Sequence, residues 1–142
     1  MSTRQLAPRG RAAFIPYPAP VRNKVVSTQR TATVELRSSL YTDATAIVER
    51  EYGHQLSLDD VARRIASSRR QLQRAYSEIG HTTFREHLTQ VRMDRAAELL
   101  ARRSVTVREV AQRVGYRQPA QFAKAFRRNR GLAPSDFRTR AR

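Results

Sequence analysis

The sequence contains no cysteine and no tryptophan, and only two of its 28 basic residues, Lys24 and Lys124, are lysines. Without a thiol, the chain forms no disulfide, no thiolate zinc site, no iron–sulfur cluster and no cysteine nucleophile. All other basic residues are arginines, whose guanidinium group donates two parallel hydrogen bonds to a phosphate or to a guanine edge.

Long apolar segments are absent as well. The apolar stretch nearest the N-terminus, residues 12–21, is interrupted by Pro16, Pro18 and Pro20, so it is neither the core of a signal peptide nor a membrane span. Together with the missing cysteine, this predicts a cytoplasmic protein that contacts no membrane.

Features of enzymes are missing too. The histidines His54, His81 and His87 lack the spacing of metal ligands, no glycine-rich phosphate loop is present, and no serine lies in a nucleophile motif. We therefore expect no enzyme, no cofactor and no metal site. A buried histidine beside a carboxylate in a closed cleft would favour an enzyme instead.

Negative charge is scarce, because 12 Asp and Glu residues stand against 28 Lys and Arg, which gives a net charge of +16. No fold requires such an excess, and it indicates a polyanionic partner. A high-GC coding bias is the alternative explanation. It accounts for single arginines on a solvated surface better than for their total.

Residues 1–40 differ in character from the rest of the chain. They contain four of the six prolines, seven basic residues and a single acid, Glu35, and no apolar period runs through them. This composition predicts a basic, mostly disordered arm, with local order over residues 31–36. A plain spacer and a wrongly extended start of the chain are the alternatives to a functional arm.

From Tyr41 onward, apolar residues return at helical spacing, which predicts a helix that ends at Gly53. Ser57 then precedes Leu58 and two acids, the typical start of a second helix, which runs to about Ile65. Further on, the apolar residues of positions 84–101 keep a spacing of three to four without glycine or proline. They predict one long helix of roughly 27 Å.

The most informative feature is an internal repeat with a period near 50. Positions 58, 61, 62, 65 and 66 recur as similar residues 49 positions later, and positions 72 and 76 recur 50 positions later, so the single-residue slip falls in the turn between them. Each copy predicts a short helix, a tight turn and a second helix. The apolar members of the two copies are Leu58, Val61, Ala62, Ile65, Leu72 and Tyr76, and Val107, Val110, Ala111, Val114, Phe122 and Phe126.

Residues 56–140 resemble the DNA-binding domain of AraC/XylS-type transcription regulators. In the first half, residues 68–74 and 91–96 fit the family pattern. The second half carries the resemblance through Val110, Ala111, Gly115, Tyr116, Phe122, Phe126, Arg127, Arg128, Gly131, Pro134, Phe137 and Arg138.

The resemblance implies an all-α fold of about seven helices at residues 41–142, preceded by the basic arm. Two helix-turn-helix units, at about 57–80 and 106–130, are joined by a linker helix at about 84–101 and closed by a short helix near 135–140. A chain without a separate ligand-binding or dimerisation domain is expected to be of the stand-alone type. It would act as a monomer on double-stranded DNA in the nucleoid, as an activator or a repressor, and family analogy alone suggests contact with RNA polymerase.

The second helix of each unit is the one that enters a major groove, so its outward residues are candidates for DNA contacts. Tyr76, Phe122, Phe126 and Phe137 are assigned to the core instead, by their helical spacing. Two departures from the family pattern stand out, Pro119 with Ala120 at the start of the second recognition helix, and His81 where glycine is frequent. The predicted base contacts are Arg70, Gln73, Arg74, Gln118, Gln121 and Lys124, and the predicted backbone contacts are Ser68, Arg69, Arg117, Arg127 and Arg128.

Two other kinds of nucleic-acid-binding protein are alternatives to a sequence-specific regulator. DNA-repair methyl acceptors carry a similar DNA-binding half, but their chemistry needs a cysteine, which this chain lacks. A non-sequence-specific architectural DNA-binding protein or an RNA-binding protein stays open, because a net charge of +16 alone would suffice for it.

Overall fold

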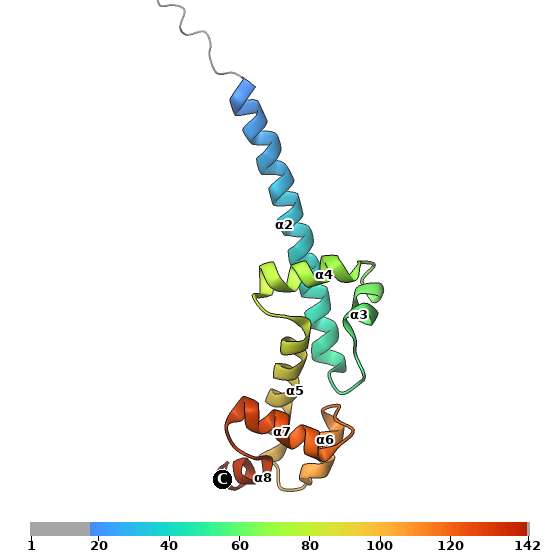
Figure 1. Cartoon of the computed structure of the whole chain (residues 1–142), viewed down its shortest axis with the longest axis vertical. Helices are drawn as coiled ribbons and strands as arrows, with labels where there is room; N and C mark the ends of the chain where they lie inside the picture. Colours follow the sequence, from blue (N-terminus) through green and yellow to red (C-terminus); the bar gives the residue numbers. More distant parts are fainter. Residues whose placement is uncertain (1–17, 142) are drawn as a thin grey trace, which may run out of the picture. The chain divides into compact units, whose positions relative to one another are not determined.

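The computed structural model describes residues 18–141, and every regular element in that range is helical (Figure 1). This confirms the predicted all-α fold of about seven helices. None of these helices is both long and apolar enough to cross a bilayer. The elements are α2 Pro18–Glu51, α3 Leu58–Arg64, α4 Arg69–Ala75, the π-helical turn η2 Tyr76–Gly80, α5 Phe84–Leu100, α6 Val107–Arg113, α7 Pro119–Arg130 and α8 Pro134–Arg140.

Helix α2 is longer than expected. Residues 18–40, predicted as part of a mostly disordered arm, form its first half, and the helix continues without a break into the segment predicted from Tyr41. The physical reason is that no glycine or proline occurs between Val21 and Tyr52, while Pro18 and Pro20 lie in the first turn, where proline is tolerated. The rest of the predicted arm, residues 1–17, lies outside the described residues.

The chain divides into two units between Leu36 and Arg37. In the first unit, the described side chains of residues 28–36 are all exposed. Residues 37–142 contain both helix-turn-helix units, and the core of this part of the chain begins at Leu40. The folded domain therefore starts slightly before Tyr41, the boundary predicted from the sequence.

Two apolar clusters form the core of residues 37–142, and helix α5 contributes to both. Its first half packs with α2, α3, α4 and η2, and its second half packs with α6, α7 and α8. Fully buried aromatic rings anchor each cluster, Tyr76 in the first and Phe122 with Phe126 in the second. These rings were assigned to the core by their spacing, and the structure agrees. The fourth, Phe137, is half-buried against the second cluster.

The turns of the two helix-turn-helix units have the same backbone geometry. The amide of Ser67 donates to the carbonyl of Ala62 at 2.8 Å, and the amide of Tyr116 donates to the carbonyl of Ala111 at 2.9 Å. Ala66 and Gly115 are both left-handed, with φ of 56° and 95°. The turn at Ala66 is thus built like the one at Gly115, at a cost of roughly 1–2 kcal/mol for an alanine in this conformation.

The helix starts follow the sequence closely. Helices α3, α4, α5 and α6 begin after a serine or threonine whose hydroxyl accepts an amide hydrogen bond of 3.1 Å from three residues ahead. These hydrogen bonds satisfy backbone donors that have no partner within the helix. Helices α7 and α8 begin with a proline, which has no such donor. The four capping residues are Ser57, Ser68, Thr83 and Thr106.

Candidate nucleic-acid interface

The first recognition helix comprises α4 and η2. Leu72, Ala75 and Tyr76 are buried on its inner side, as the spacing predicted. Its outer side carries polar and basic side chains, and all of those predicted to contact DNA are exposed. These are Ser68, Arg69, Arg70, Gln73 and Arg74.

These five residues differ in what already engages them. The Ser68 hydroxyl accepts the amide hydrogen bond of Gln71, and Arg69 forms an ion pair of 3.2 Å with Asp59. Within the described residues, the side chains of Arg70, Gln73 and Arg74 have neither a hydrogen bond nor an ion pair. Those three were predicted to contact bases, and base contact stays a prediction.

The second recognition helix is α7, whose inner side buries Phe122 and Phe126 against the second apolar cluster. Gln118 is its N-cap residue, and the Gln118 side chain makes no capping hydrogen bond. Within the part of the chain that the structure describes, the side chains predicted to contact DNA at this helix form no hydrogen bond and no ion pair. All six are exposed, namely Arg117, Gln118, Gln121, Lys124, Arg127 and Arg128.

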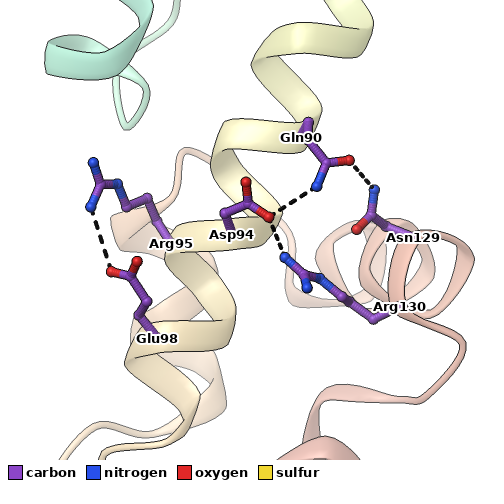
Figure 2. Close-up of polar contacts among 6 residues, drawn as sticks. All are labelled: Gln90, Asp94, Arg95, Glu98, Asn129 and Arg130. Atoms are coloured by element: carbon purple, nitrogen blue, oxygen red, sulfur yellow. Dashed lines mark hydrogen bonds and ion pairs between the residues drawn. The ribbon is translucent and has the colours of Figure 1, made fainter.

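A polar network fixes the far end of helix α7 to the linker helix α5 (Figure 2). The Asn129 amide donates to Oε1 of Gln90 at 3.0 Å, and the Gln90 amide donates to Oδ1 of Asp94 at 2.9 Å. Arg130 forms an ion pair with the same oxygen of Asp94. This network was not predicted from the sequence. The only indication of it in the sequence is that Gln90 and Asp94 lie four positions apart on the predicted linker helix.

Arg92 forms a joint between the two halves of the domain. Its Nε donates to the carbonyl of Tyr52 at 2.8 Å, and its Nη2 donates to the carbonyl of His54 at 2.9 Å. The same guanidinium lies 5.6 Å from the ring centroid of Tyr116, in the turn of the second unit. Burial lowers the pKa of Arg92 from its usual value. A group of such high pKa still keeps its charge at neutral pH.

Two glycines make this joint possible. A Cβ atom on Gly115 would lie 2.8 Å from Nη2 of Arg92, and one on Gly53 would lie 2.5 Å from the carbonyl oxygen of Arg113. Gly53 was predicted as the end of a helix, and the helix ends two residues earlier, at Glu51. The φ of Gly53 is not left-handed, and its role is the close approach to helix α6.

Arg138 of helix α8 closes the second half in a similar way. Its Nε donates to the carbonyl of Leu100 at 3.0 Å, and its Nη2 donates to the carbonyl of Val105. These carbonyls belong to the end of α5 and the loop after it, where helix carbonyls lack partners within the helix. Arg138 therefore holds α8 and α5 together and is engaged by the fold.

Two helix-turn-helix units with equivalent turns, joined by one helix and presenting exposed polar recognition helices, define a DNA-binding regulator of the double helix-turn-helix class. A helix-turn-helix domain family matches residues 61–140, which is more than half of the chain. A crystal structure of an AraC-type DNA-binding domain-containing regulator from Chromobacterium violaceum is similar. It has 25% identity and a TM-score of 0.68, over 72% of this chain and 92% of that one. The chain belongs to the AraC/XylS-type family of transcription regulators.

Two further proteins are similar to this chain, one in sequence and one in structure. The Msm operon regulatory protein of Streptococcus mutans is 32% identical over 92 residues, which is 65% of this chain and 33% of that protein. The DNA-binding domain of the global transcriptional factor AdpA, solved in complex with a target DNA, is 27% identical. It has a TM-score of 0.66, over 70% of this chain and 89% of that domain. The chain thus spans about a third of the length of the operon regulator.

Proposed function

We propose that this protein binds double-stranded DNA at a specific sequence and regulates transcription, with α4 and α7 in adjacent major grooves. The observation that carries the proposal is the pairing of two geometrically equivalent turns with two recognition helices, each of which has several exposed polar side chains that lack partners within the described residues. Side chains left free in this way are available for base edges and phosphates. The likeness to a DNA-binding domain solved on its target DNA supports the same conclusion.

Base reading is assigned to six of the side chains that no protein group engages. On the first recognition helix these are Arg70, Gln73 and Arg74, and on the second they are Gln118, Gln121 and Lys124. Arg and Lys suit guanine, and Gln suits adenine. Phosphate contacts are assigned to the residues that flank them, which are Ser68, Arg69, Arg117, Arg127 and Arg128.

The fixed joint at Arg92 and the network around Asp94 support a binding mode with a set distance between the two recognition helices. Successive major grooves on one face of a duplex lie roughly 34 Å apart, or about 10 base pairs. One copy of the chain then covers an asymmetric site of about 20 base pairs, since its two recognition helices differ in sequence. A monomer suffices for this mode.

Selection of bound duplexes from a random pool, with the full chain, tests the proposal directly. We expect enrichment of one site whose two unequal halves are centred about 10 base pairs apart. A palindromic site would contradict binding as a monomer, and a pool without enrichment would contradict sequence-specific binding altogether.

The large positive charge gives a second candidate, a DNA-coating or RNA-binding protein without sequence preference. Competition separates the two candidates. A specific regulator prefers its selected duplex over random duplex by roughly 4–10 kcal/mol, whereas a coating protein binds both alike. An RNA-binding protein would instead prefer single-stranded or structured RNA over either duplex.

The regulatory setting rests on family analogy. By analogy with the family, the proposal includes location on the bacterial nucleoid in the cytoplasm, contact with RNA polymerase, and activation or repression. Transcription in vitro from a promoter that carries the selected site distinguishes activation from repression. If transcription is repressed, and is not increased at any promoter position where the selected site is placed, the polymerase contact is removed from the proposal.

A further inference from the structure

Charge is distributed unequally between the two helix-turn-helix units, although their backbones are equivalent. The first unit, residues 57–80, contains five arginines and three acids. The second unit, residues 106–130, contains seven basic residues and one acid, Glu109. One pair of equivalent positions even reverses its sign, since Asp59 of α3 corresponds to Arg108 of α6 in the repeat. Two units with the same geometry therefore present different electrostatic surfaces.

Most arginines of the first unit are already paired with carboxylates of the same half. Arg63 pairs with Asp60 at 2.5 Å and Arg64 pairs with Glu51 at 2.6 Å. Arg69 pairs with Asp59 at 3.2 Å. Because each of these guanidinium groups lies beside an opposite charge, the field that a phosphate would meet there is weak.

The second unit has almost no such pairing. Arg130 binds Asp94, and the single acid Glu109 is engaged by its own helix start at Thr106. All twelve side-chain carboxylates of the protein lie within the described residues, so no acid is left out of this comparison. Six basic side chains are exposed without an ion pair within those residues, namely Arg108, Arg113, Arg117, Lys124, Arg127 and Arg128.

From this asymmetry we infer that the second helix-turn-helix unit supplies most of the phosphate binding, while the first contributes sequence reading with little non-specific affinity. The inference rests on the proposed function and divides its labour between the two units. Each phosphate contact made by a basic residue releases counterions and adds about 0.9 to the slope of log affinity against log salt concentration. On duplexes of random sequence, that slope therefore comes mainly from residues 106–130.

Two variants with equal loss of charge test this division in the full chain. Arg127→Gln with Arg128→Gln removes two adjacent unpaired arginines of the second unit. Arg63→Gln with Arg64→Gln removes two adjacent paired arginines of the first unit. The measurement is the affinity for a duplex of random sequence over a series of salt concentrations. We expect the slope to fall by up to about 1.8 in the first variant and to stay unchanged in the second.

A third variant acts in the opposite direction. Asp59→Asn releases Arg69 from its carboxylate, so we expect stronger binding to the random duplex and a slope that rises by up to about 0.9. Circular dichroism of each variant establishes that it is folded, and the Asp59 variant keeps the test meaningful if either double variant unfolds.

The outcomes separate this inference from the proposed function. Equal losses of slope in the two double variants would mean that binding follows net charge alone. An unchanged slope in the Asp59 variant would mean that the carboxylate of Asp59 does not hold Arg69 away from DNA. Either outcome overturns the division of labour. Failure of the unmodified chain to bind any duplex at low salt would overturn the proposed function instead. A larger loss of slope in the Arg63 and Arg64 variant would place the phosphate binding in the first unit.

Discussion

The hydroxyl of Tyr76 lies 3.0 Å from Nδ1 of His87, and this pair joins the first recognition helix to the linker helix. A shift of 50 positions, which relates Tyr76 to Phe126 in the repeat, relates His87 to Phe137. The ring centroids of Phe126 and Phe137 lie 5.2 Å apart in a T-shaped contact. One structural position is thus filled by a polar pair in the first half and by an apolar pair in the second. Each pair is complete only when both of its members are present.

We therefore expect the substitutions Tyr76→Phe and His87→Phe to be coupled. His87→Phe leaves the fully buried Tyr76 hydroxyl without its partner, at a cost of about 1–3 kcal/mol of unfolding free energy. Tyr76→Phe strands the ring nitrogen of the half-buried His87, at a cost of about 1 kcal/mol. The double variant has two phenylalanines, as the second half does, so its loss of unfolding free energy is smaller than the sum of the two single losses. Urea unfolding of the three variants gives the coupling, and strictly additive losses would contradict it.

The same pair predicts a pH dependence. Burial lowers the pKa of His87 below its usual value, so the unfolded chain binds a proton at a higher pH than the folded chain does. Stability is then fully present above about pH 6.5, the ordinary value for histidine, and is lost as pH falls through the lowered pKa of the folded state. Unfolding free energies measured between about pH 5 and 8 check this. His87→Phe should flatten the curve in that window, and an unchanged curve would assign the effect to other groups.

In the two turns, substitutions at the equivalent positions Ala66 and Gly115 should change the stability of the fold in opposite directions. Ala66 holds a left-handed conformation that glycine adopts freely, so Ala66→Gly should stabilise the fold by about 0.5 kcal/mol after the greater freedom of the unfolded glycine is counted. Gly115→Ala should destabilise it by more than about 1 kcal/mol, because the new Cβ is strained and also meets the Arg92 guanidinium. Thermal unfolding of both variants tests the pair. Equal signs would mean that the turns are not equivalent.

Residues whose effect is local could be predicted from the sequence, and residues that act across the fold could not. The capping role of Ser57, the buried faces of the recognition helices and the linker helix follow from spacing and composition. The joint does not, because Arg92 is distinguished only by carbonyls at Tyr52 and His54, some forty positions earlier. The first half of helix α2 was not predicted either, because it is polar and shows no apolar period, although nothing after its first turn breaks a helix.

Arg92 gives a prediction about the spacing of the two recognition helices. Its planar guanidinium reaches two carbonyls and the Tyr116 ring at once, which a lysine ammonium cannot reproduce. Arg92→Lys should lower stability by about 1–2 kcal/mol, as two hydrogen bonds from a charged donor are weakened. It should also relax the distance between the two half-sites in duplex selection. Arg95→Lys is the matched control, because Arg95 makes ion pairs of 3.5 Å with exposed carboxylates, and such pairs contribute little. A half-site spacing as strict as in the unmodified chain would show that Arg92 does not set it.

The base-reading assignment predicts a local loss of specificity. Arg74→Ala and Lys124→Ala should each weaken binding to the selected site by about 1–3 kcal/mol and relax the preference at one position of that site, in a different half for each variant. Neither side chain has a protein partner within the described residues, so neither substitution should lower the stability of the fold. Arg63→Ala is the control, since Arg63 is also exposed but is paired with Asp60. Equal weakening on selected and random duplexes would make Arg74 and Lys124 phosphate contacts. Relaxed preference in the same half for both variants would contradict a separate groove for each recognition helix.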